Sequence, residues 1–166
     1  METCQSLQFQ IFKNMYINEL IKRIKNDILN SIPENQSNWE YVNFRLKVLI
    51  TYSESKSIIF IDDSQKSISV SFRDEKGRLI FPDTTWQLRE VMYNLTPEKG
   101  AWYSMEMTIL PSGNFNLQFE YEIKPEFSIL LSDLDFIKDF QKFPRIKEFI
   151  PEWLDEILKR NQTDIE

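Results

Sequence analysis

The side chains that could do chemistry in this chain are mainly carboxylates, because histidine is absent and cysteine occurs only once. The 166 residues include 26 Asp and Glu, one Cys and three Gly. A sequence without His has no Ser-His or Cys-His nucleophile pair and few ways to build a zinc or iron site. No P-loop, Rossmann glycine pattern or G-x-S-x-G motif occurs, and Cys4 has no His to activate it. We therefore predict that the chain is not an enzyme and uses no cofactor.

Two acidic turns offer a first alternative, which is a metal site. Asp62 and Asp63 follow one expected strand, and Asp74 and Glu75 follow the next. Carboxylates bind Mg²⁺ or Ca²⁺ when several oxygens converge, but the Ca²⁺-loop spacing, with a central Gly and a terminal Glu, is absent. We interpret both turns as solvated loops and predict no metal site.

A second group of acids lies toward the C-terminus. Its members are Glu120, Glu122, Glu126, Asp133, Asp135 and Asp139, against Lys124 and Lys138. A glycosidase-like hydrolase needs only two correctly spaced carboxylates, so a catalytic pair is one interpretation. The others are an acidic surface that binds a basic partner and an ordinary solvated face, because the outer side of an antiparallel strand is usually polar.

The charge distribution favours the binding interpretation. Residues 101–166 carry thirteen acids against seven Lys and Arg, which accounts for the whole net charge of −6. Such a segment repels nucleic acid and attracts a basic protein. Tryptophan is enriched at interface hot spots, so one Trp beside these acids is a candidate anchor. The residues predicted to contact a partner are Glu120, Glu122, Asp133, Asp135 and Trp102.

Helical periodicity predicts helices at the start and in the middle of the chain. Apolar residues recur at three- and four-residue spacing in residues 5–31, and Pro33 ends this helix. Asp83 or Thr84 is the expected N-cap of a middle helix that stops before Pro97.

Two further helices are expected beyond Pro125. The first has Ser132 or Asp133 as its cap, and the last has Pro151 in its first turn. The residues with helical spacing in the first of these are Leu130, Leu134, Ile137 and Phe140.

Two-residue alternation predicts strands in between. The expected strands are 42–50, 58–61 and 68–72, joined by turns at 53–57 and 62–65, and the arms of a hairpin at 103–109 and 115–121. Short connections make them a three-strand meander plus a hairpin. The order of elements indicates an α+β fold with a single domain, 1–166, in which N-terminal, middle and C-terminal helices pack against an antiparallel sheet of about five strands. No membrane-spanning stretch or signal peptide is evident, so we expect a cytoplasmic protein.

The hairpin resembles a known family. The run from Ala101 to Glu122, with Trp102, Met107-Thr108-Ile109 and Ser112-Gly113-Asn114-Phe115, is similar to the "W…LT(L/I)…SGKF…DFDY(D/E)" hairpin of the YezG-like bacterial immunity proteins. Other matches to that family are Ile32-Pro33, Trp39-Glu40-Tyr41-Val42 and Ile150-Pro151-Glu152. This chain departs from the family in having Gln118 before Phe119, and residues 123–149 match none of the family's patterns.

The resemblance implies a protein that binds a cognate toxin in the cytoplasm and blocks the toxin's active site or substrate groove. The toxins of such proteins are often nucleases, whose basic surfaces suit an acidic inhibitor. The alternative is an adaptor or chaperone-like module that binds several proteins and no toxin. The sequence leaves the oligomeric state open.

Overall fold

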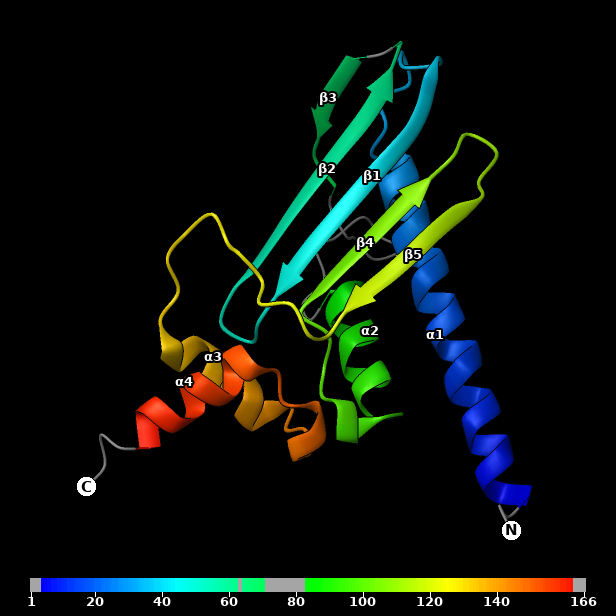
Figure 1. Cartoon of the computed structure of the whole chain (residues 1–166). Coiled ribbons are helices and arrows are strands. Elements are labelled where there is room, and N and C mark those ends of the chain that lie inside the picture. Colours follow the sequence, from blue (N-terminus) through cyan, green and yellow to red (C-terminus); the bar gives the residue numbers. More distant parts are fainter. Residues whose placement is uncertain (1–3, 63, 71–82, 163–166) are drawn as a thin grey trace.

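The computed structural model describes residues 4–62, 64–70 and 83–162, and it has the α+β architecture expected from the sequence (Figure 1). The strands in this part of the chain are β1 (Trp39–Val48), β2 (Ser53–Ile61), β3 (Ser64–Ile68), β4 (Ser104–Ile109) and β5 (Phe115–Glu120). They form one antiparallel sheet in the order β3-β2-β1-β4-β5. The α-helices are α1 (Cys4–Asn30), α2 (Thr84–Tyr93), α3 (Asp133–Lys142) and α4 (Glu152–Gln162), and the 3₁₀ turns are η1 (Pro97–Lys99) and η2 (Lys147–Phe149).

The predicted meander and hairpin are confirmed, but the turn predicted at 53–57 is wrong, the turn predicted at 62–65 is shorter than expected, and the third strand begins at Ser64 and not at Ile68. Residues 53–57 belong to β2, because pairing with β1 extends that strand beyond its apolar part, and the turn lies at Leu49 to Tyr52. Ser64 already pairs with Ile61, so a two-residue loop joins β2 to β3. Asp62 takes a positive φ of 46° there, which short hairpin loops require. The expected turn with Asp74 and Glu75 lies outside the described residues.

One face of the sheet is covered by α1 and α2 and forms the main core. Alternate residues of the central strand β1 point into it, and all of them are buried: Val42, Phe44, Leu46 and Val48. Helix α1 presents Leu20, Ile24 and Ile28 at four-residue spacing, and each is fully buried against this cluster. The apolar residues of α1, which have helical spacing, and those of β1, which alternate, therefore pack together in a single apolar layer.

The opposite face of the sheet carries the other set of alternate residues. Tyr41 of β1 stacks on Phe60 of β2 with ring centroids 4.1 Å apart, and Arg45 of β1 pairs with Glu106 of β4 at 3.0 Å. Among the described residues, no helix covers this face (Figure 1). The polar half of the predicted alternation thus stays in contact with water.

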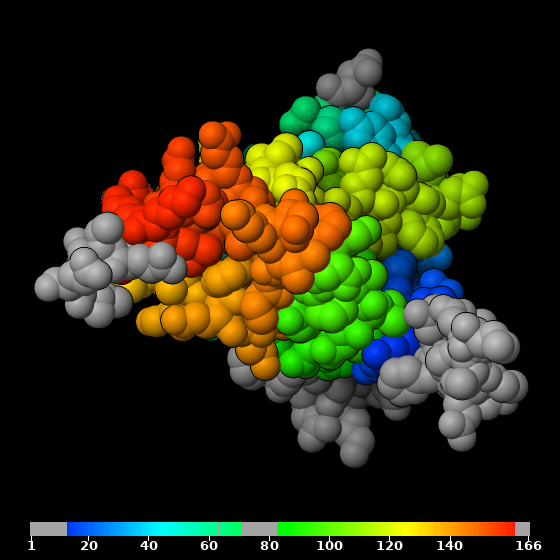
Figure 2. Space-filling model, turned by 60° about the horizontal axis from the view of Figure 1, so that its bottom comes forward, coloured from blue at the N-terminus to red at the C-terminus, as the bar shows by residue number. Residues whose placement is uncertain are grey.

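A second, smaller core lies at the end of the sheet where β1 and β5 finish. We call residues 121–162 the C-terminal unit and the described residues before them the sheet region. The C-terminal unit forms this core together with Leu49 and Tyr103 of the sheet region. The buried members of the core are Leu49, Tyr103, Phe136, Leu154 and Ile157. In Figure 2 the C-terminal unit forms a lobe, in orange and red, beside the green residues of α2. In the described part of the chain, no helix is long and apolar enough to cross a membrane.

Candidate protein-binding surface

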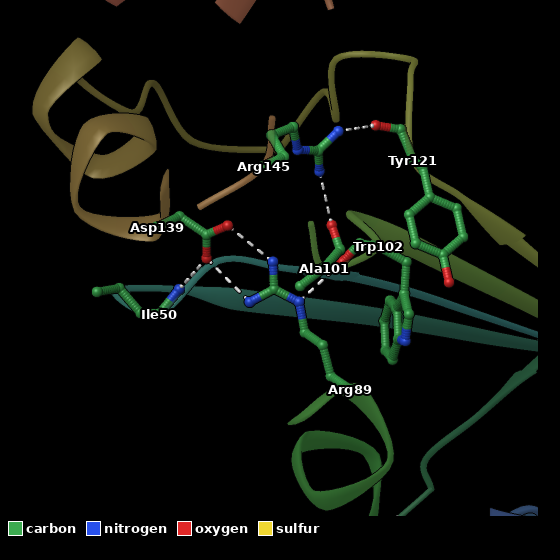
Figure 3. Close-up of polar contacts among 7 residues, drawn as sticks. All are labelled: Ile50, Arg89, Ala101, Trp102, Tyr121, Asp139 and Arg145. Atoms are coloured by element: carbon green, nitrogen blue, oxygen red, sulfur yellow. Dashed lines mark hydrogen bonds and ion pairs between the residues drawn. The ribbon is translucent and has the colours of Figure 1, made fainter. Parts of the chain in front are cut away.

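A buried ion pair joins the C-terminal unit to the sheet region (Figure 3). Arg89 of α2 donates two hydrogen bonds to Asp139 of α3, with N–O distances of 2.9 and 2.7 Å, and its Nε donates to the carbonyl of Trp102 at 2.8 Å. The side chains of Arg89 and Asp139 are 0% and 3% exposed. The amide of Ile50, just beyond β1, also donates to Asp139 at 2.9 Å. The carboxylate of Asp139 therefore fixes α3 against both α2 and the β1–β2 turn.

A second buried arginine holds the chain on the other side of this junction (Figure 3). Arg145 donates to the carbonyls of Ala101, Tyr121 and Phe149 at 2.9 to 3.1 Å. Its guanidinium passes so close to Gly100 that a Cβ there would lie 2.3 Å from the arginine Nε. Three segments far apart in the sequence thus share one guanidinium group.

Residues 125–132, which we call the connecting loop, lie between β5 and α3. This loop is attached to the β1–β2 hairpin. The Ser128 amide donates to Glu54 at 2.8 Å, and the Ser128 hydroxyl donates to the same carboxylate. Lys47 donates to the carbonyl of Glu126, and the ring of Phe127 packs edge-on against Tyr52 at 5.5 Å. The hydrogen bonds from Ser128 lower the pKa of Glu54, so this anchoring carboxylate is ionised at neutral pH.

The outer side of the connecting loop is apolar and exposed. Leu130 is 101% exposed, Ile129 49% and Leu134, in the first turn of α3, 57%. We call these three residues the apolar tip. Their neighbours Phe127 and Leu131 pack against the second core, so the loop has one side that is packed and one side that is open. In Figure 1 the loop, in yellow, arcs away from the strands before it enters α3.

This arrangement corrects the helical register expected for α3. Ser132 caps the helix: its amide and hydroxyl donate to Asp135 at 2.9 and 2.7 Å. Leu130 therefore precedes the helix instead of forming part of its core face. The residue that α3 buries most among the apolar ones is Phe136.

Two of the four predicted acids bind backbone or hydroxyl donors. Glu120 accepts from the amides of Glu122 and Ile123 at 2.8 and 3.1 Å, and these bonds lower its pKa. The pKa of Asp135 is lowered by its hydrogen bond from the Ser132 hydroxyl. Both donors are neutral, so each carboxylate keeps its full negative charge on the surface.

The other two predicted acids differ from each other. Asp133 forms an ion pair with Arg160 of α4 at 2.6 Å, which offsets its charge. Glu122 is exposed, and so is Glu126 in the connecting loop. Of the acidic group seen in the sequence, Asp139 is the exception, since it is buried in the ion pair with Arg89. Of the acidic group seen in the sequence, Glu120, Glu122, Glu126 and Asp135 therefore remain as negative charges at the surface.

Trp102 is not available as the predicted anchor, because its side chain is 0% exposed. It belongs to the main core, and its ring lies 5.3 Å from that of Phe119. The mistake has a simple physical cause. Trp102 lies at an element's edge in the sequence, but α2 and β5 close over that edge in the fold.

The structure can be compared with the two chemical alternatives, which are a glycosidase-like carboxylate pair and a metal site. A shallow hollow of about 340 Å³ lies beside Glu120 and Glu122, with Lys99 on its rim. A glycosidase's general acid needs a raised pKa, whereas the pKa of Glu120 is lowered. Within the described residues, no group of three or more His, Cys, Asp or Glu is placed to hold a metal ion.

Comparison with known proteins adds no further assignment: neither a protein-family model nor a curated protein matches the chain.

Proposed function

We propose that this chain is an immunity protein that binds a cognate toxin in the cytoplasm and blocks its active site or substrate groove. The observation that carries the proposal is the surface around residues 120–135, which combines exposed carboxylates with an apolar loop that is held in place. The resemblance of the hairpin 101–122 to the YezG-like immunity proteins supports the same role and suggests a basic nuclease as the toxin.

The mechanism follows from charge. A nuclease must offer a basic groove to phosphates, and a carboxylate surface can occupy that groove in their place. Opposite fields speed the encounter of the two proteins, and this effect weakens as salt screens it. The inhibitor needs no chemistry of its own, since it acts by excluding the substrate.

Co-expression tests the function directly. The gene next to that of this chain should encode a protein that stops growth when it is expressed alone. Growth should return when the two are expressed together, and the two proteins should elute as one complex. The proposal fails if the neighbouring gene encodes no growth inhibitor, or if growth stays blocked and no complex forms.

Charge variants test the mechanism. Replacing both exposed acids, Glu122→Gln with Glu126→Gln, should slow association with the toxin about three- to tenfold at low salt and should make the association rate less dependent on salt. The matched control is Glu19→Gln with Glu34→Gln, which removes two exposed acids from α1 and the segment after it. Equal slowing in both pairs would mean that net charge alone matters and that this surface has no special part.

An adaptor or chaperone-like role remains the alternative class. Purification of the chain from its native cell separates the two roles, because an immunity protein should recover one dominant toxin and an adaptor should recover several proteins in similar amounts.

A further inference from the structure

The apolar tip exposes side chains that belong to neither of the two hydrophobic cores. Leu130 is 101% exposed, while the main core and the second core are filled by other residues. Single exposed apolar residues are ordinary on protein surfaces. Ile129, Leu130 and Leu134, however, lie within one stretch of six residues and are all about half exposed or more.

The backbone that carries the tip is fixed by contacts with the β1–β2 hairpin and by the cap of α3. Glu54 binds the amide and the hydroxyl of Ser128, which directly precedes Ile129, and Ser132 begins α3 with a reciprocal cap. Phe127 is packed against Tyr52 on the β1–β2 hairpin. A loop held in this way loses little conformational entropy when a partner covers its tip. An exposed leucine that a partner then buries adds to affinity through the apolar surface that it removes from water.

Charge indicates which kind of partner would cover the tip. Two carboxylates flank the tip along the chain, Glu126 four residues before Leu130 and Asp135 five residues after it, and the exposed Lys138 lies near Asp135. An apolar centre with an acidic rim is complementary to an apolar recess rimmed by Lys and Arg.

We propose that the apolar tip, with Leu130 at its centre, is the anchor of the toxin complex and enters an apolar recess beside the basic groove of the toxin. This inference rests on the proposed function and assigns to the connecting loop the anchoring role that the sequence suggested for Trp102. Carboxylates around the tip guide the encounter, and the tip slows dissociation once the complex has formed.

The test compares Leu130→Ala with Met15→Ala, using the toxin encoded beside this gene. Met15 belongs to α1, a helix that Figure 1 shows apart from the connecting loop, and is 60% exposed, so its variant also removes exposed apolar surface. Leu130→Ala should raise the dissociation constant about 30-fold, mainly through faster dissociation, while Met15→Ala should change it less than about threefold. Leu130→Asp should abolish protection of growing cells. Because Leu130 and Met15 are both exposed, all three variants should keep the melting temperature of the wild type.

Three results would overturn this inference. The first is a complex in which both Leu130 variants bind as tightly as the wild type, which would leave the neutralising function intact but place its anchor elsewhere. The second is equal weakening by Met15→Ala. The third is a free chain that sediments as a dimer and becomes monomeric with Leu130→Asp, because the tip would then be covered by a second copy. Failure of the wild type itself to bind or protect would instead refute the proposed function.

Discussion

The sheet region and the C-terminal unit are stabilised in different ways. In the sheet region, α1 and α2 cover β1 and β4 with apolar side chains, and the buried members of that cluster are all hydrophobic. The C-terminal unit has only a small apolar core, which includes Leu49 and Tyr103 of the sheet region, and Arg89, Asp139 and Arg145 add buried hydrogen bonds between the two regions. The sheet region is thus stabilised mainly by buried apolar surface, whereas the C-terminal unit combines a smaller apolar core with a few buried charges whose geometry is directional.

The difference matters because substitutions reduce stability in different ways at the two kinds of contact. Apolar packing is non-directional, so its loss scales with the volume removed. A buried ion pair adds little over a well-packed apolar replacement, but it is costly to break by removing one partner, because an uncompensated charge then remains buried. The orientation of α3 and of the connecting loop, and with it the proposed binding surface, therefore depends on a directional contact.

The largest expected effect follows from breaking that contact. Asp139→Asn keeps the size of the side chain but leaves the guanidinium of Arg89 buried without a counter-charge. We expect the free energy of unfolding to fall by about 3–5 kcal/mol, measured by urea denaturation. Amide hydrogen exchange should increase more in α3 and α4 than in β1 and β4.

The control is an ion pair of the same chemistry on the open face of the sheet. Arg45 and Glu106 have side chains that are 61% and 41% exposed, and Glu106→Gln should cost at most about 1 kcal/mol. Equal losses in Asp139→Asn and Glu106→Gln would show that the buried pair is no special link. Uniform exchange across the sheet and the helices would show that the two regions are not distinct.

The next effect concerns the close approach of Arg145 to Gly100. Gly100 has a φ of 74°, and an added Cβ would meet the arginine Nε at 2.3 Å. Gly100→Ala should therefore cost about 2–4 kcal/mol, from both backbone strain and displacement of the guanidinium. Thermal or urea unfolding measures this loss.

Gly113 separates the two causes. Its φ is 84°, but no heavy atom lies within 4 Å of the position of its Cβ. Gly113→Ala should cost only the backbone term, about 1–2 kcal/mol. If the two variants lost the same stability, the guanidinium of Arg145 would not be holding the C-terminal unit tightly at this point.

The same contrast explains what could be predicted from the sequence. The sheet region was predictable because its apolar residues recur at regular spacing. They recur every three or four positions in α1, and they alternate with polar residues in β1 and the hairpin. The ends of β2 and β3 were not, because cross-strand pairing and a two-residue loop at Asp62 determine them, and neither leaves a clear pattern in a polar stretch. The fold class therefore followed from the sequence, while the strand ends did not.

The candidate site was harder to predict because its contacts join distant parts of the chain. Asp139 looked like one more acid of a negative segment, but its partner Arg89 is 50 residues away. Leu130 matched the helical spacing of Leu134 and Phe140, and only the cap at Ser132 places it outside α3. Ser132 was one of the two expected caps, and a helix that begins after it already leaves Leu130 outside, so the expected cap and the expected helical position of Leu130 were inconsistent.

The smallest expected effect comes from the exposed carboxylate of that cap. Asp135 lies in the first turn of α3, where it accepts from Ser132, and its pKa is lowered in the folded chain. A lowered pKa means that the folded state binds this proton less readily than the unfolded state. The carboxylate thus adds stability above its ordinary pKa of about 3.9, and this contribution is lost as the pH falls through the lower, folded-state value.

Asp135→Ala should therefore cost about 0.5–1 kcal/mol at pH 7, from the lost cap and the lost interaction with the helix dipole. The stability gap between this variant and the wild type should shrink as the pH is lowered from 5 toward about 2.5 in a urea titration series. A gap that stays constant over this range would mean that the ionised form of Asp135 contributes nothing. The cap would then position Leu130 through hydrogen bonds that do not depend on the charge of Asp135.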